Sequence, residues 1–398
     1  MRPGGLNMRV VDVDSHYLEP LDWLVQIDPA LAAEIPPSDP IERIVRGVVG
    51  DLLDVVPPSQ RPADPLALLG PSGRRSLEAM IAMNEEEAAE AAAGSKSSYE
   101  AEARIALCDE NGIDVQFIGS TLGTGPYVSA IREGRPDLAL RALESFNRWS
   151  AQTLSGHTDR LIPITLVDLS DVDWAIAEIT RMRAAGSRAF QVRAEPVSET
   201  KSLAHPDFDR LWSVAEDLGM AVVLHIAAGR AELKQGWFFN GGDPSHFAIL
   251  HLVNGSIVPQ IALAALLIEG VLERHPGLVV IVQEFGISWL PHFMSTIDSL
   301  AGGPYGQFFG MTQSDYGLPL KPSEYMRRQV RVSPLVTADP LRPTLDLVPE
   351  EMLVFSSDFP HQEGREDAVG LFQDQMKDCS SRARERFFGD SIAELMDL

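Results

Sequence analysis

Short runs of β-branched and apolar residues recur along the chain, and longer segments with helical periodicity separate them. Eight of these runs are predicted strands, at 8–14, 115–120, 160–166, 189–194, 221–226, 278–284, 329–334 and 352–357. The helical segments include 171–186, 205–219 and 259–277. The first of them opens on Asp171, a favourable N-cap residue, and ends at Gly186. Strands that alternate with helices indicate parallel βαβ units.

Eight such units predict an α/β fold of the (β/α)8 or TIM-barrel type, whose active sites lie at the C-terminal ends of the strands. The alternative is a doubly wound sheet that binds a nucleotide, which requires a glycine-rich phosphate loop after an early strand. The nearest candidate, GSTLGTG at 119–125, has the wrong spacing, and no GxxxxGK[ST] motif occurs. The pattern therefore favours the barrel.

Residues from about 24 to 104 exceed what one βα unit needs. They contain a proline-rich stretch at 55–73 and a helix-forming stretch at 78–97 that carries many acidic residues. We expect an insertion after the first strand that lies over the barrel mouth, as a lid or a dimer contact. No repeat or domain boundary is visible, so residues 1–398 are expected to form a single barrel domain.

Composition narrows the possible partners. The net charge of -24 argues against binding to nucleic acid or to an anionic membrane surface. No run approaches the ~20 apolar residues of a membrane helix, and the N-terminus leaves no room for a signal peptide. The two cysteines, Cys108 and Cys379, have no CxxC partner. We therefore expect a cytoplasmic protein, a homo-oligomer such as a dimer, that acts on a small molecule.

The stretch VVDVDSHYLEP, residues 10–20, places Asp12, Asp14 and His16 at alternate positions directly after an apolar run. Side chains two positions apart on a strand point to the same side, so the pattern predicts three ionisable groups on one face. Burying carboxylates and an imidazole together is costly unless they bind something, and a metal ion is the usual partner.

Other strand ends carry similar residues. His225 lies near the end of the fifth strand, Glu284 ends the sixth, and Asp358 follows the eighth. Each has an ordinary explanation alone, as a packed histidine or a helix cap. Together with Asp14 and His16 they would bring nitrogen and oxygen ligands to one rim of the barrel. Such a set suits Zn, Fe, Mn or a similar divalent ion.

Four stretches of the chain resemble the successive signatures of the amidohydrolase-2 group, a branch of the metal-dependent amidohydrolase superfamily. They read DVDSHYLEP, HPDFDRLWSVAEDLGMAVVLH, GVLERHPGLVVIVQEFGISWLP and SSDFPHQEG, and the resemblance covers 8–23 and about 104 to the C-terminus. It implies that Asp14, His16 and His225 are metal ligands. It also implies that Asp358 binds the metal, accepts the proton of its water, or does both, because a divalent ion lowers the pKa of that water toward ~7.

Two positions depart from the pattern of these relatives. Relatives with a well-defined decarboxylase activity usually have a histidine where this chain has Glu284. Superfamily members with two metals often use a modified lysine at the end of the fourth strand, where this chain has Arg193. A lysine bridge is therefore not expected, although Glu284 can hold or bridge a second ion. We expect one ion and leave a second open.

Three further residues are candidates for roles around the metal. His361 either takes part in catalysis by orienting the substrate or caps its loop. Arg193 has a guanidinium fork that suits a substrate carboxylate, or it forms a salt bridge with Glu195. His251 is placed to reach the mouth from the loop after the fifth strand. The candidate catalytic residues are thus Asp358, Glu284 and His361, and the candidate substrate-binding residues are Arg193 and His251.

Three functions fit these residues. The first is a metal-dependent hydrolase that uses activated water on an amide, ester, thioester or activated C–C bond of a small organic molecule. The second is a non-oxidative decarboxylase of an aromatic or unsaturated carboxylic acid. The third is an inactive barrel that acts as a binding protein. Glu284 in place of histidine favours hydrolysis, and the intact ligand set argues against an inactive protein.

Overall fold

The computed structural model describes residues 8–35, 96–226, 255–301, 304–308, 318–361 and 364–398, with single positions at 59, 75, 78 and 82. Most of the predicted insertion at about 24–104, with its expected role as a lid or dimer contact, lies outside these residues. His251 lies outside them too.

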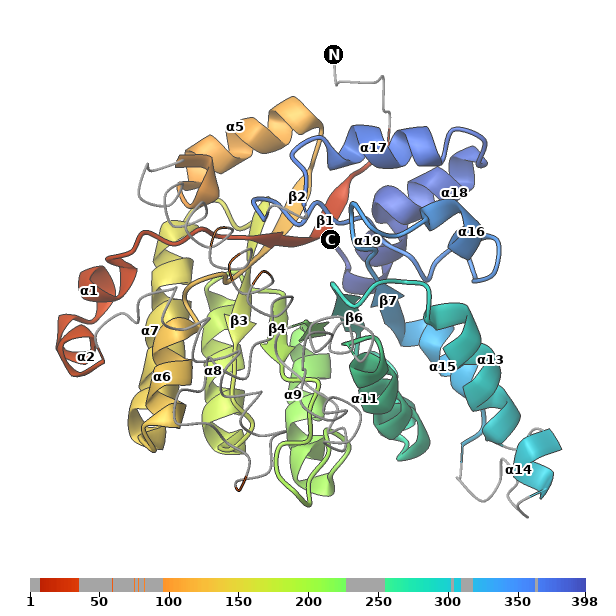
Figure 1. The fold of residues 1–398 in the computed structure, drawn as a ribbon, viewed down its shortest axis with the longest axis horizontal. Helices are drawn as coiled ribbons and strands as arrows, with labels where there is room; N and C mark the ends of the chain where they lie inside the picture. The colour runs from red at the N-terminus through yellow and green to blue at the C-terminus, as the bar shows by residue number, and fades with distance from the viewer. Residues whose placement is uncertain are drawn as a thin grey trace.

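Seven strands form one parallel sheet in which each strand pairs with the next along the chain, and helices surround it (Figure 1). The strands are β1 (Val11–His16), β2 (Val115–Gly119), β3 (Leu161–Leu166), β4 (Ala189–Val192), β5 (Ala221–His225), β6 (Val280–Gln283) and β7 (Val330–Val332). The order and direction of these strands confirm the predicted α/β fold of the TIM-barrel type.

The helices follow the strands as βα units require. They are α1 (Trp23–Ile27), α2 (Pro29–Glu34), η4 (Lys96–Ser98), α5 (Ala101–Asn111), α6 (Gly125–Arg132), α7 (Pro136–Thr153), α8 (Val172–Ala184), η5 (Pro206–Phe208), α9 (Asp209–Leu218), α11 (Ile257–Ile268), α12 (Val271–Arg274), α13 (Leu290–Leu300), α14 (Pro304–Phe308), α15 (Pro322–Gln329), α16 (Leu341–Leu345), α17 (Ala368–Gln375), α18 (Ser381–Glu385), η8 (Arg386–Asp390) and α19 (Ser391–Met396). As predicted, Asp171 caps α8, because its side chain accepts a hydrogen bond from the Trp174 amide.

Two predicted elements differ from the structure. The single helix expected over 259–277 is instead α11 followed by α12, because Gly270 takes a left-handed φ of 73° between them. The eighth strand, expected over 352–357, forms only one parallel bridge, between Val332 and Leu353. Its ladder is interrupted because the Phe355 amide donates to the carbonyl of Phe387 in η8, outside the sheet.

The segment around Phe355 nevertheless closes the barrel. Its amide and carbonyl groups bond to β7 on one side and to β1 on the other. The bonds run from the Val332 amide to Met352 O (2.9 Å), from the Val354 amide to Val332 O (3.1 Å), from the Val13 amide to Phe355 O (3.1 Å) and from the Asp358 amide to Asp14 O (2.8 Å). The last of these fixes Asp358 beside the end of β1.

The inside of the barrel is filled by alternate residues of β1 to β6 and by Val354. Ile392 and Met396 of α19 pack against this inner cluster and belong to it. A second, larger apolar cluster lies between the strands and the helices, as with Leu224 and Trp212. The apolar interior therefore forms a rigid support beneath the polar residues at the C-terminal ends of the strands.

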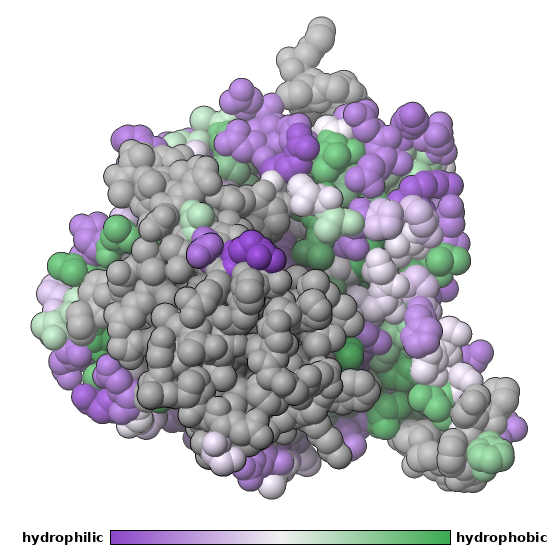
Figure 2. Space-filling model, viewed as in Figure 1, coloured by the Kyte–Doolittle hydropathy of each residue, from purple (hydrophilic) through white to green (hydrophobic). Residues whose placement is uncertain are grey.

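The face drawn in Figure 2 carries both hydrophilic and apolar side chains. On the face drawn in Figure 2, hydrophilic residues cover α17 and α18, and apolar side chains show near α13 and α14. The exposed apolar residues there include Leu300 and Phe308. Within the described part of the chain, no helix has the length and apolar character needed to cross a membrane.

The inner cluster predicts the effect of removing Ile392. Ile392→Ala should lower the free energy of unfolding by about 2–5 kcal/mol, because it deletes buried methyl groups from a packed interior. Chemical denaturation measures this change. The control is Leu347→Ala, whose side chain is 70% exposed and whose change should stay within about 0.5 kcal/mol. Equal effects of the two substitutions would show that α19 does not support the barrel.

Candidate metal centre

The first strand delivers Asp14 and His16 to the barrel mouth through an irregularity. The register of β1 against β2 shifts between Asp12 and Ser15, so β1 carries an extra residue there. Such a bulge breaks the alternation of side chains. Asp12 consequently turns away from Asp14 and His16, and its carboxylate accepts hydrogen bonds from Gln116 Nε2 (2.8 Å) and the hydroxyl of Ser357. The prediction that all three residues share one face is wrong for Asp12.

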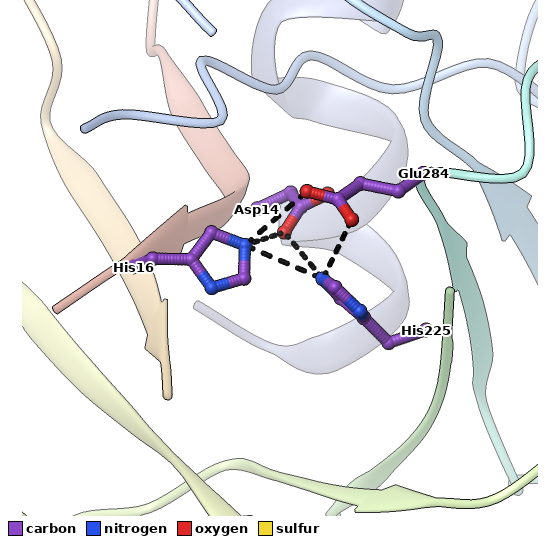
Figure 3. Close-up of side chains that lie close together, drawn as sticks. All are labelled: Asp14, His16, His225 and Glu284. Carbon is purple, nitrogen blue, oxygen red and sulfur yellow. Dashed lines mark hydrogen bonds and ion pairs between the residues drawn. The ribbon is translucent and has the colours of Figure 1, made fainter. Parts of the chain in front are cut away.

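Four side chains from three strand ends point toward one another (Figure 3). The Nε2 atom of His16 lies 3.3 Å from Asp14 Oδ1 and 3.3 Å from His225 Nε2. Glu284 spans the two imidazoles, with Oε1 3.5 Å from His16 Nε2 and Oε2 3.4 Å from His225 Nε2. The edge of a tetrahedron of ligands about 2.1 Å from a central ion is about 3.4 Å. The four donors are therefore spaced as ligands of one divalent ion.

The histidine tautomers also suit a metal. His225 Nδ1 lies 2.8 Å from the carbonyl oxygen of Ile226, and His16 Nδ1 lies 3.4 Å from that of Ser120. A carbonyl oxygen only accepts hydrogen bonds, so each Nδ1 carries the proton and donates it. In the neutral form of each ring, Nε2 then has a lone pair directed at the centre of the cluster, and this is the form in which histidine binds a metal.

Two carboxylate oxygens in the cluster lack a partner. Asp14 Oδ1 and Glu284 Oε1 are buried, and neither has a hydrogen-bond donor within the part of the chain that the structure describes. Leaving a buried polar atom unsatisfied costs about 1–3 kcal/mol, and more when it is charged. A divalent cation satisfies both oxygens, so the donor set and its geometry fit the metal ion that the sequence predicts.

Asp358 and His361 adjoin this cluster on one side. His361 Nδ1 lies 2.8 Å from Asp358 Oδ1 and 3.5 Å from Glu284 Oε1. The His361 ring stacks on that of His16, with centroids 4.0 Å apart. Asp358 Oδ1 lies 3.6 Å from His16 Nε2. The structure thus brings together Asp14, His16, His225, Glu284, Asp358 and His361, all named from the sequence as site residues.

Glu284, directly after β6, and Asp358, directly after the segment 352–357, both have a strained backbone conformation. Glu284 has φ 57° and Asp358 has φ 53°, in the left-handed region that residues other than glycine rarely adopt. Each such residue costs on the order of 1–3 kcal/mol and persists only where its surroundings hold it. In this backbone conformation both carboxylates lie near His16 Nε2, Glu284 at 3.5 Å and Asp358 at 3.6 Å.

Burial and neighbouring charges together raise the pKa of Asp358 and lower that of Glu284. Burial, together with the neighbouring charge of Glu284, raises the pKa of Asp358 to about 9, and the hydrogen bond to His361 offsets this only in part. Burial would also raise the pKa of Glu284, but His225, His16 and His361 together bring it well below its ordinary value. Without a cation the two carboxylates thus differ in protonation near neutral pH.

Glu19 holds the loop after β2, a role that sequence reasoning missed. Its buried carboxylate accepts hydrogen bonds from the hydroxyl of Ser120 (2.9 Å) and from three backbone amides of the same loop. These amides belong to Thr121 (3.2 Å), Leu122 (2.8 Å) and Gly123 (3.1 Å). The stretch GSTLGTG, rejected as a phosphate loop, therefore does bind an anion with its amides, but the anion is a side chain of the protein.

The same loop connects Glu19 to the site. Thr121 Oγ1 lies 2.9 Å from His361 Nε2, so the position of the loop fixes the position of the imidazole. The only signal for Thr121 in the sequence was its place directly after a strand. Buried Glu19 was visible within the HYLEP stretch, but its partners lie about 100 residues further along the chain.

Arg104 of α5 supports β1 from the outer side. The buried guanidinium donates to Gln116 Oε1 (3.2 Å) and to the carbonyl of His16, and it lies 4.7 Å from the centre of the Phe359 ring. Since Gln116 also binds Asp12, a buried polar chain runs from α5 to the strand that carries the ligands. This arrangement requires residues distant in sequence, and the sequence patterns did not indicate it.

Arg193 lies at the mouth, but its charge is already paired. Val192 is aligned with Leu224 across β4 and β5, so the next residues, Arg193 and His225, follow at the same level. The guanidinium contacts the carboxylate of Glu195, which was the alternative expected from the sequence, and the side chain remains 55% exposed. A role in substrate binding stays a prediction, as does that of His251.

Comparisons with known proteins agree with this fold. The model of the amidohydrolase family matches residues 96–398. No curated protein matches the sequence. An amidohydrolase from Mycobacterium avium subsp. paratuberculosis K-10 is similar in structure, with 22% identity and a TM-score of 0.70, over 98% of this chain and 100% of that one.

Two decarboxylases are also similar in structure. The 5-carboxyvanillate decarboxylase from Sphingomonas paucimobilis has 19% identity and a TM-score of 0.62, over 98% of this chain and 100% of that one. The dihydroxybenzoic acid decarboxylase from Polaromonas sp. JS666, solved with manganese and 2-nitroresorcinol, has 14% identity and a TM-score of 0.58, over 98% of this chain and 97% of that one. At these identities the likeness establishes the fold and leaves the reaction open.

Substitution of either histidine in the cluster should release metal. His16→Ala and His225→Ala each remove one of four donors, and we expect less than one tenth of the Mn²⁺ per chain that the native protein retains after dialysis, with unchanged circular dichroism. Elemental analysis measures the Mn²⁺ content per chain. His157→Ala, a partly exposed histidine that contacts Glu102, is the control and should retain all of it. Full metal content in both variants would show that these imidazoles are not ligands.

Removing the charge of Glu19 should loosen the loop after β2. Glu19→Gln replaces an acceptor of several N–H and O–H groups by an amide that turns its own donors toward some of them. We expect a loss of about 1–3 kcal/mol in the free energy of unfolding. The control is Glu199→Gln at an exposed position. If the two substitutions had equal effects, the Glu19 hydrogen bonds would not contribute to stability.

Proposed function

We propose that this chain, which belongs to the amidohydrolase family, is a metal-dependent hydrolase that acts on an amide, ester, thioester or activated C–C bond of a small organic molecule. One observation supports this most directly. Asp358 lies beside the four proposed metal ligands, and its carboxylate is oriented by His361. A carboxylate in that place is positioned to accept a proton from an attacking water.

The residues divide the chemistry between them. Asp14, His16, His225 and Glu284 would hold the divalent ion, which supplies polarisation of the substrate and an acidified water at neutral pH. Asp358 accepts the proton of the attacking water and returns it to the leaving group, as a general base and then a general acid. His361 keeps the Asp358 carboxylate in place, and Thr121 holds the outer nitrogen of His361.

Glu284 also supports hydrolysis over decarboxylation. It adds a negative charge at the position where decarboxylating relatives usually have histidine. Asp14, Glu284 and Asp358 place three carboxylates around one centre, and this charge opposes the approach of a substrate carboxylate to the metal. A neutral amide or ester meets no such repulsion.

The second candidate is a non-oxidative decarboxylase of an aromatic or unsaturated carboxylic acid. The observation in its favour is the structural likeness to a 5-carboxyvanillate decarboxylase and a dihydroxybenzoic acid decarboxylase, over nearly the whole chain.

Incubation of the metal-loaded protein with aryl esters, anilides, thioesters and hydroxybenzoic acids distinguishes the hydrolase from the decarboxylase. Hydrolysis products without carbon dioxide support the hydrolase, and carbon dioxide release from the acids supports the decarboxylase.

Substrate contacts are proposed for Arg193 and His251. Arg193 has its guanidinium at the level of His225 and more than half exposed, so it can bind a polar group of the substrate while keeping Glu195 as a partner. His251 belongs to the segment after β5 that lies outside the described residues, and its role rests on the sequence alone.

Asp358→Asn tests the general base. The amide keeps the shape of the side chain but cannot accept the proton, so turnover per bound metal should fall by about 10²–10⁴-fold, with a smaller change in KM. Turnover and metal content are measured on the same sample, with a substrate found in the panel above. Unchanged turnover per bound metal would remove Asp358 from the general-base role and favour the decarboxylase.

A further inference from the structure

Polar side chains also follow strands that carry none of the proposed metal ligands. Asp168 comes two residues after β3, and Arg193 comes directly after β4. The pairing of β3 with β4 and of β4 with β5 places both residues at about the level of His225. Neighbouring strands lie about 4.8 Å apart, so a small molecule bound at the metal cluster can extend over this part of the mouth.

Tyr127 of α6 connects Asp168 with Arg193. Its hydroxyl donates to Asp168 Oδ2 (2.6 Å), and the other carboxylate oxygen accepts from the Ser170 amide (2.7 Å). Burial and the hydrogen bond to Asp168 raise the pKa of Tyr127 to about 12, and the neighbouring Arg193 opposes this rise only in part. The phenol therefore stays protonated at neutral pH and keeps its proton directed at Asp168. Its oxygen remains an acceptor for the guanidinium of Arg193.

Arg193 has more N–H groups than these partners use. Its Nη2 donates to Glu195 Oε2, and Tyr127 is its second hydrogen-bonding neighbour. A guanidinium has five N–H donors in a planar fork, so two acceptors occupy only part of it. The side chain is also 55% exposed. Arg193 is therefore held in position and still presents donors to a molecule in the mouth.

The charges around Arg193 favour an uncharged acceptor. Glu195 balances the guanidinium, and Asp168 adds a second carboxylate behind Tyr127. A substrate carboxylate would meet a cation whose charge is already matched, and it would lie close to two other carboxylates. The oxygen of a ketone, amide or hydroxyl accepts the same N–H groups without adding charge. The net charge of -24 acts in the same direction.

We propose that Arg193, positioned by Tyr127 and Glu195, binds an uncharged acceptor oxygen of the substrate at a point remote from the bond that reacts. The substrate is then a small molecule with a reacting amide or ester at the metal cluster and a neutral ketone, amide or hydroxyl oxygen at Arg193. We call Arg193, Tyr127, Asp168 and Glu195 the Arg193 subsite. The proposal names a substrate class for the proposed hydrolase and rests on that function.

Three esters that differ at one position test the role of Arg193. They are 4-acetylphenyl acetate, with a neutral acceptor, 4-carboxyphenyl acetate, with an anion, and 4-methylphenyl acetate, with neither. Arg193→Met should lower kcat/KM at least five-fold more for the acetyl ester than for the methyl ester, mainly through KM. Comparing the variant with the native protein on each ester cancels the intrinsic reactivity of the esters.

Arg210→Met is the matched control, because this arginine has the same 55% exposed side chain and contacts one carboxylate, that of Asp173. It should change kcat/KM equally for the three esters. Equal losses on the acetyl and methyl esters in Arg193→Met would overturn the proposal.

Tyr127→Phe tests whether Tyr127 acts through Arg193. The substitution keeps the ring but removes the hydroxyl between Asp168 and Arg193, so KM for the acetyl ester should rise about 3–10-fold while kcat changes less. The rise in KM for the methyl ester should be at least three-fold smaller. Equal rises for the two esters would leave Tyr127 with a structural role only and contradict its place in the Arg193 subsite.

Glu195→Gln tests the charge balance through a change in preference. Removing this carboxylate leaves the charge of Arg193 without its partner, so kcat/KM for the carboxyl ester should rise about ten-fold relative to the acetyl ester. Glu199→Gln, at an exposed position nearby in the chain, is the control and should keep the native preference. An unchanged preference in Glu195→Gln would contradict the role assigned to the Glu195 charge.

Binding without turnover separates this proposal from the proposed hydrolase. Saturation-transfer NMR on the Zn²⁺-loaded protein compares acetophenone, which has an acceptor oxygen, with ethylbenzene, which has none. Arg193→Met should weaken the binding of acetophenone at least five-fold more than that of ethylbenzene. This result without hydrolysis of any ester would retain the Arg193 subsite and overturn the hydrolase. Hydrolysis of the esters with no dependence of either measurement on Arg193 would overturn the subsite and retain the hydrolase.

Discussion

The concentration of negative charge at the barrel mouth is the constraint on which the other features depend. Three carboxylates, one in β1, one directly after β6 and one directly after the segment 352–357, are buried within contact distance of the His16 ring. Their mutual repulsion and the loss of hydration oppose folding unless cations or donors compensate for them. The imidazole of His361, 2.8 Å from Asp358, compensates in part, and a divalent ion would compensate further.

The surrounding protein holds this unfavourable arrangement in place. Glu284 and Asp358 both take left-handed backbone conformations, and the Asp358 amide is tied to the carbonyl of Asp14. From outside the barrel Arg104 binds the carbonyl of His16, and Glu19 fixes the loop that positions His361 through Thr121. The dense inner core below prevents these groups from relaxing away from one another.

The fold and most of the proposed metal-binding residues could be predicted from local sequence patterns. The residues that hold them in position could not. Strand runs and their terminal polar residues predicted His225, Glu284 and Asp358, because parallel strands bring their ends to one rim. The bulge that turns Asp12 away depends on how β1 fits β2, so counting alternate positions could not reveal it. The partners of Glu19 and Arg104 are set by tertiary contacts over long sequence separations. The sequence shows two charged residues at these positions but not which groups they bind.

The central claim is that Asp14, His16, His225 and Glu284 bind one divalent ion at the C-terminal ends of the strands. Anomalous X-ray diffraction from crystals loaded with Mn²⁺ tests it most directly, because the signal locates the metal without reference to activity. The account predicts a peak within about 2.0–2.3 Å of the facing atoms of these four side chains. A fully loaded crystal with its strongest peak at other residues, or with these four side chains uncoordinated, would contradict it.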